Sequence, residues 1–131
     1  MKHSILSISA ILLVMAGAAL AKGHENAGPA AATIHMSATK QYEPKTVTIN
    51  AGDTVEWVND DQGNLHNVTT DKDATDMPKA ISMPRGAKPF NSGLMPPGKT
   101  FRYTFTVPGT YRYVCVPHQP DMVGVIVVRP K

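Results

Sequence analysis

Segments in which apolar and polar residues alternate recur along the chain, and they constrain the fold more than any other feature. A period of two residues places successive side chains on opposite faces of a β-strand, so alternation predicts a strand with one buried face. Such segments lie at 46–49, 54–57, 101–106 and 111–115, and a nearly continuous apolar run follows at 123–128. Turn-forming residues separate them. We predict an all-β fold, a Greek-key antiparallel β-sandwich of about seven to eight strands.

Residues 71–92 interrupt this pattern. They contain Pro78, Pro84 and Pro89 and show no clear period, so we expect an irregular excursion with a weak strand or a turn of helix. The 11 prolines and 10 glycines also argue against a helical bundle. With 131 residues the chain is long enough for one domain and too short for a Rossmann or barrel enzyme.

The first 21 residues have the three parts of an export signal. Lys2 precedes an apolar stretch at 5–20, and Ala19-Leu20-Ala21 fits the small-x-small pattern of a cleavage site. The alternative is a membrane anchor, but 16 positions that include Ser, Ala and Gly fall short of the roughly 20 apolar residues of a span. We therefore predict a soluble protein of the periplasm without stable membrane insertion.

These features divide the chain into three parts. We expect a signal peptide at 1–21, a flexible polar segment at 22–32 and one folded domain at 33–131. Small exported domains often carry disulfides, but this chain has a single cysteine, Cys115. Its stability must therefore come from a packed core.

Acidic and basic residues are mixed along the chain. There are 13 Lys and Arg against 10 Asp and Glu, a formal net charge of +3. The basic residues form no cluster of the kind that contacts a phosphate backbone. We therefore expect no nucleic-acid partner.

Residue types that bind metals concentrate in Cys115-Val-Pro-His118-Gln-Pro-Asp-Met122. Because Cys115 closes one predicted strand and Met122 opens the next, the loop between them turns back and presents thiolate, imidazole and thioether to one point. His66, at a strand edge after a turn, is the natural fourth group. Two His, one Cys and a weak axial Met form the ligand set of a blue-copper electron-transfer site. Zinc prefers a closed tetrahedral set without Met.

Each of these residues also has a structural interpretation. A free Cys115 can act as a small buried hydrophobe, and Met122 can simply fill the core. A lone His66 is more often a half-buried histidine whose hydrogen bonds are satisfied. The metal site is favoured because Cys, His and Met fall within eight residues and the cysteine has no partner for a disulfide.

Five sequence segments resemble the plastocyanin/pseudoazurin/amicyanin branch of the cupredoxins, a resemblance that covers about 33–129. They are Tyr42 to Asn59, His66-Asn67-Val68, Pro97 to Phe101, Gly109 to His118, and Met122-Val-Gly124. The resemblance implies a type 1 copper protein with one copper ion per chain. It implies His66, Cys115 and His118 as equatorial ligands, Met122 as the long axial ligand, and Asn67 as a residue that braces the ligand loop by hydrogen bonding. Three residues separate His118 from Met122, whereas plastocyanin-like loops have four and amicyanin-like loops two, so the loop length fits neither subfamily.

The same resemblance implies a soluble monomer that shuttles single electrons between redox proteins, such as a cytochrome or a dehydrogenase or reductase. The partner would dock transiently at the edge of His118. An apolar rim suited to such docking is expected from Leu94, Met95, Pro96, Pro97, Pro117 and Pro120.

Two other functions are weighed against the electron carrier. A periplasmic copper chaperone or copper-storage protein would use Met and His residues outside the main site, such as His35 and Met36. A copper enzyme would draw further ligands from His-x-His pairs, and the sequence has none. We therefore expect an electron-transfer protein rather than an enzyme.

The predicted new terminus is a second candidate for copper binding. Cleavage after Ala21 would leave Lys22-Gly23-His24, whose free amine and third-position His can bind Cu(II) in a square-planar nitrogen set. The simpler interpretation is a loose tail with an accidental His.

Overall fold

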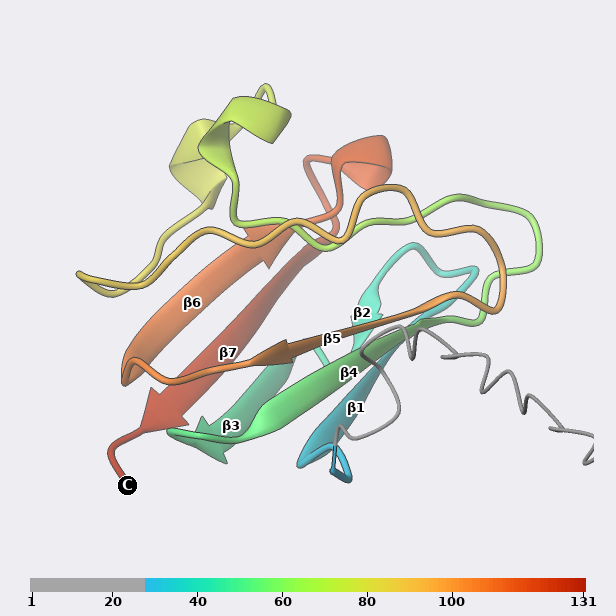
Figure 1. Ribbon diagram of the computed structural model, residues 1–131. Helices are drawn as coiled ribbons and strands as arrows, with labels where there is room; N and C mark the ends of the chain where they lie inside the picture. The colour runs from blue at the N-terminus through green and yellow to red at the C-terminus, as the bar shows by residue number, and fades with distance from the viewer. Residues whose placement is uncertain (1–27) are drawn as a thin grey trace, which may run out of the picture.

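The computed structural model describes residues 28–131, which form two β-sheets packed against each other (Figure 1). The strands are β1 (Ala32–Met36), β2 (Tyr42–Glu43), β3 (Thr46–Asn50), β4 (Thr54–Asn59), β5 (Thr100–Thr104), β6 (Gly109–Val114) and β7 (Val123–Arg129). Three short 3-10 helices join them: η1 (Lys72–Ala74), η2 (Pro78–Ala80) and η3 (Val116–His118). The predicted signal peptide at 1–21, the terminal Lys22-Gly23-His24 and most of the segment 22–32 lie outside the described residues.

One sheet has the strand order β2-β1-β4-β5 and the other β3-β7-β6, which confirms the predicted all-β sandwich. Within residues 28–131, two of the five strand pairings are parallel, β1 with β4 and β3 with β7. Alternation predicts a strand but carries no information on the direction of its neighbour. Direction follows from the connections, and the chain reaches β4 from β1 only after passing through β2 and β3, a crossover that permits a parallel pair.

The long connection between β4 and β5 contains the predicted irregular excursion at 71–92, which holds η1 and η2. Two backbone hydrogen bonds between Ser82 and Arg112 fasten this excursion to β6. None of the helices in residues 28–131 has the length and apolar character that crossing a bilayer requires.

Aromatic side chains fill the space between the sheets. Trp57 and Tyr113 are fully buried, and the indole Nε1 of Trp57 donates a hydrogen bond of 3.1 Å to the Tyr113 hydroxyl. The Tyr42 ring lies edge-on to Tyr113, 4.6 Å between centroids. Its hydroxyl donates to the carbonyl of Asn67 at 2.6 Å, so the core directly supports the residue next to His66.

Candidate metal centre

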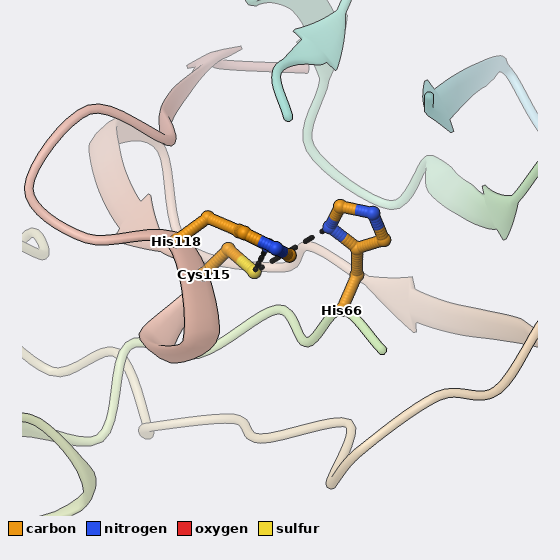
Figure 2. Close-up of side chains that lie close together, drawn as sticks. All are labelled: His66, Cys115 and His118. Carbon is orange, nitrogen blue, oxygen red and sulfur yellow. Dashed lines mark hydrogen bonds between the residues drawn. The ribbon is translucent and has the colours of Figure 1, made fainter. Parts of the chain in front are cut away.

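Three side chains converge at one end of the sandwich, near η3. The Cys115 Sγ lies 3.7 Å from His66 Nδ1 and 3.5 Å from His118 Nδ1, and the ligand atoms of all three residues lie within 4.8 Å of one another. Figure 2 shows a ring nitrogen of each imidazole directed at the sulfur. In the part of the chain that the structure describes, this is the one group of three or more His, Cys, Asp or Glu side chains arranged to hold a metal ion.

Backbone pairing places His66 beside the cysteine. His66 and Met95 exchange two hydrogen bonds, of 3.3 and 2.8 Å, in an isolated antiparallel bridge. Thr69 pairs in the same way with Val114, the last residue of β6, at 3.1 Å for both bonds. The segment after β4 is therefore laid along the end of β6, and Cys115 follows immediately.

The ligand loop between β6 and β7 closes on itself through its backbone. Cys115 N–H donates to the Met122 carbonyl at 3.0 Å, and Met122 N–H donates to the His118 carbonyl at 3.1 Å. The short helix η3 carries Pro117 in its first turn, where the missing N–H is not needed. Met122 thus belongs to the same closed loop as Cys115 and His118, and its side chain is fully buried.

Asn67 links the two segments of the centre. Its Oδ1 accepts a 2.7 Å hydrogen bond from Val116 N–H, and its own N–H donates to Cys115 Sγ at 3.4 Å. One residue therefore ties the ligand loop to the His66 segment and places a donor against the sulfur.

Burial sets the protonation of these groups in the metal-free protein. It raises the pKa of the Cys115 thiol above its ordinary value. It also lowers the pKa of His118, and the neighbouring His66 and Lys40 side chains act in the same direction. At neutral pH His118 is therefore a neutral imidazole with a lone pair to offer, and the thiol must lose its proton when a metal binds.

The exposure of the ligand candidates differs. His66 and Cys115 are fully buried, whereas His118 is partly exposed at the surface. The site therefore has one edge in contact with solvent.

Sequence reasoning missed Asp61, which is only 3% exposed and contacts His66 Nε2 through its Oδ2 at 3.1 Å. Hydrogen bonds from Gly63 N–H, from the Asn64 amide and from His66 lower the pKa of Asp61 to about 2. The segment from Asp60 to Gly63 does carry a signal, because Asp followed two residues later by Gly favours a side-chain bond to that backbone N–H. That signal predicts the bond to Gly63 and not the contact with His66.

The predicted apolar rim needs one correction. Leu94 is 61% exposed, but Met95 is only 1% exposed and belongs to the hydrophobic core. Because Met95 pairs its backbone with His66, its side chain points inward where that of Leu94 points outward. The other predicted rim residues are exposed, namely Pro96, Pro97, Pro117 and Pro120.

The three converging side chains fit a first-row transition metal. Atoms separated by 3.5 and 3.7 Å can share one ion at about 2.0 Å for nitrogen and about 2.3 Å for sulfur. A soft thiolate with two imidazoles suits copper. Residues 30–129 match the copper binding proteins of the plastocyanin/azurin family. The chain belongs to the plastocyanin/azurin family. Its cofactor is copper, with one ion per chain.

Plastocyanins are among the relatives of this chain. The chain is 38% identical over 122 residues to the plastocyanin of Prochlorothrix hollandica, a match that covers 89% of this chain and 87% of the relative. It is 36% identical over 107 residues to the chloroplastic plastocyanin of Chlamydomonas reinhardtii, covering 79% and 70%. The match to the chloroplastic plastocyanin of Tetradesmus obliquus, 39% over 89 residues, spans only 58% of that protein and 67% of this chain.

Solved structures agree with the cupredoxin prediction. A reduced amicyanin mutant superposes with a TM-score of 0.60 at 30% identity, covering 80% of this chain and 87% of the amicyanin. The copper-containing nitrite reductase of Thermus scotoductus superposes with a TM-score of 0.61 at 30% identity, but only 25% of that chain is covered against 84% of this one. This chain is thus similar in extent to the amicyanin and to a quarter of the enzyme.

Proposed function

We propose that this protein is a soluble type 1 copper protein that carries single electrons between redox proteins in the periplasm. The observation that supports this most strongly is the convergence of His66, Cys115 and His118 in a chain of the plastocyanin/azurin family. When bound, copper supplies a one-electron couple, Cu(II)/Cu(I), without making or breaking a bond in a substrate.

The proposed equatorial ligands are His66 Nδ1, Cys115 Sγ and His118 Nδ1, with the Met122 thioether as the axial ligand. The distances between the first three support their assignment. Met122 is assigned because it lies buried in the same closed loop. Asn67 holds the two segments together through Val116 and Cys115, so the ligands change position little when the ion changes its charge.

Electrons would enter and leave through the edge of His118, the partly exposed member of the set. The exposed apolar residues proposed to surround it form a rim, defined as Leu94, Pro96, Pro97, Pro117 and Pro120. Such a rim suits brief docking of a redox protein on a monomer, because transient electron-transfer encounters use small interfaces.

Other functions are less well supported. A copper store or chaperone would need further ligand groups, and residues 28–131 hold a single cluster of His, Cys, Asp or Glu suited to a metal. His35 binds Asp60 instead. An enzyme is disfavoured because the similarity to the nitrite reductase covers a quarter of that chain.

Visible absorption and electron paramagnetic resonance of the copper-loaded protein test the proposal. We expect an intense thiolate-to-Cu(II) band with narrow hyperfine splitting. Cys115→Ser should abolish this band and His66→Ala should shift it and change the hyperfine splitting, whereas His35→Ala, a matched histidine outside the centre, should leave both unchanged. A wild-type protein that stays colourless in the presence of Cu(II) would contradict the proposal.

A negative charge introduced into the rim tests the proposed docking surface. Pro97→Glu should slow electron exchange with a redox protein and leave the copper spectrum unchanged, because Pro97 is exposed and outside the ligand set. Pro108→Glu is the control, since this exposed proline precedes β6 at the end opposite to Cys115. Equal exchange rates for both variants would place docking elsewhere.

Rapid transfer of copper to an acceptor with slow electron exchange would instead favour the chaperone.

A further inference from the structure

We propose that Asp61 is a positioning residue for the metal centre, which fixes the tautomer and orientation of His66 and biases bound copper toward Cu(II). This inference rests on the proposed function, because it assigns His66 Nδ1 to the ion. The opposite ring nitrogen, Nε2, contacts a buried carboxylate from the turn that precedes the histidine.

The contact is direct and enclosed. Asp61 Oδ2 lies 3.1 Å from His66 Nε2, and the side chains are 3% and 0% exposed. On the other side of the ring, His66 Nδ1 faces Cys115 Sγ at 3.7 Å. The imidazole is therefore held between a carboxylate and the thiol, with one nitrogen committed to each.

This arrangement selects one tautomer. An ionised carboxylate only accepts hydrogen bonds, so in the neutral ring Nε2 carries the proton and donates a hydrogen bond to Asp61. Nδ1 is then left with a lone pair that points toward the sulfur. A histidine so arranged is ready to bind a metal before the metal arrives, and the carboxylate makes it a stronger donor.

A second set of contacts holds Asp61 itself in place. Its carboxylate accepts from Gly63 N–H and from the Asn64 amide, both at 2.9 Å, and its N–H donates to Asn59 Oδ1 at 2.9 Å. The Asn59 amide in turn donates to the Met95 carbonyl at 2.8 Å. Because Met95 pairs with the backbone of His66, the carboxylate and the imidazole are positioned by one connected network.

The charge of Asp61 has a consequence for the redox equilibrium. A buried anion attached to a ligand stabilises the more highly charged ion, and the low-dielectric surroundings screen it weakly. Removing this charge favours Cu(I). We expect the equilibrium constant for reduction of the Asp61→Asn variant by a common mediator to rise at least tenfold, which for one electron is about 59 mV.

The first test needs neither copper nor a variant. Nitrogen-15 NMR of the histidine rings in the copper-free full chain distinguishes a protonated from a bare ring nitrogen. The expected result is a single His66 tautomer with the proton on Nε2. A proton on Nδ1, or a mixture of the two tautomers, would overturn the inference.

The second test compares two neighbouring carboxylates in the copper-loaded protein. Asp61→Asn and Asp60→Asn each remove one negative charge from the same turn, but Asp60 is exposed and binds His35 rather than His66. Only the Asp61 variant should shift the equilibrium for reduction and alter the electron paramagnetic resonance spectrum. Equal shifts in both variants would show a general charge effect and refute a role through His66.

The two proposals fail in different ways. If wild-type protein binds copper with an intense blue band while Asp61→Asn behaves like Asp60→Asn, the electron carrier stands and the role of Asp61 is wrong. If the blue band is absent from wild-type protein, the proposed function fails, and the NMR experiment alone still decides whether Asp61 fixes the tautomer of His66.

Discussion

The protonation states of individual residues in the metal centre determine how many protons copper displaces. In the copper-free protein the buried thiol of Cys115 keeps its proton at neutral pH because burial raises its pKa. His118 is already neutral because burial lowers its pKa. A cation therefore displaces one proton when it binds.

This predicts a definite pH dependence of copper binding. Between about pH 7 and pH 8 the apparent affinity should rise about tenfold per pH unit, because the thiol is protonated throughout that range and higher pH helps to remove its proton. Competition against a chelator of known affinity measures the slope. Cys115→Ser is the control and should lose it, and an affinity of the wild-type protein that is independent of pH would contradict the assignment.

Adjacent residues at the site can differ completely in their structural role, as Leu94 and Met95 show. Met95→Lys should lower the free energy of unfolding by about 3 kcal/mol or more, because it places a charge in the core beside the pair that holds His66. Leu94→Lys, one residue away and 61% exposed, should change it by no more than about 0.5 kcal/mol. Denaturant unfolding of the copper-free variants measures both values, and equal effects would show that the two side chains are equally exposed.

At the scale of elements, the pairing of β6 with β7 governs the ligand loop that joins them. Tyr113 in β6 lies directly opposite Gly124 in β7, and one further pair, Val114 with Val123, separates them from Cys115 and Met122. A Cβ on Gly124 would lie 2.2 Å from Cζ of Tyr113, so the tyrosine ring occupies the space that any other residue would need. Glycine there allows the ring to reach Trp57 across the core.

Gly124→Ala should therefore lower the free energy of unfolding by about 3 kcal/mol, since the ring cannot move without breaking its bond to Trp57. Gly28→Ala is a suitable control because a Cβ at Gly28 meets nothing within 4 Å. Urea unfolding of the two copper-free variants gives the comparison. Similar midpoints for both would mean that Tyr113 can be displaced at little cost.

The whole molecule derives its stability from packing and not from covalent links. Cys115 is the only cysteine of the sequence, so no disulfide can form within the chain. The aromatic core connects the two sheets and reaches the site through the bond from Tyr42 to Asn67. Any ion that binds only the folded protein adds to this stability.

Removal of copper should therefore lower the midpoint of thermal unfolding, while a reducing agent should leave the midpoint of the copper-free protein unchanged. Ligand linkage gives about 4 kcal/mol when the free ion is present at about a thousand times its dissociation constant. Scanning calorimetry with and without copper measures the difference. An identical midpoint in both states would mean that copper binds the unfolded chain as well as the folded one.

Local patterns in the sequence were sufficient for the fold class and the residue types of the centre. Alternation at 46–49 and 54–57 predicted β3 and β4, because the period of a strand is set by its own backbone. The spacing of Cys115, His118 and Met122 on one turn between strands predicted a single loop of metal-binding groups, since residues so near in the chain cannot lie far apart.

Only the tertiary structure decided what lies between segments distant in sequence. The parallel direction of β1 beside β4, the inward side chain of Met95 and the contact of Asp61 with His66 all depend on how separate segments pair in space. Chain connectivity and backbone hydrogen bonds choose among such pairings, and neither is written in a local pattern. The sequence identifies the side chains that can bind an ion, whereas the packing of the two sheets determines which other groups contact those side chains.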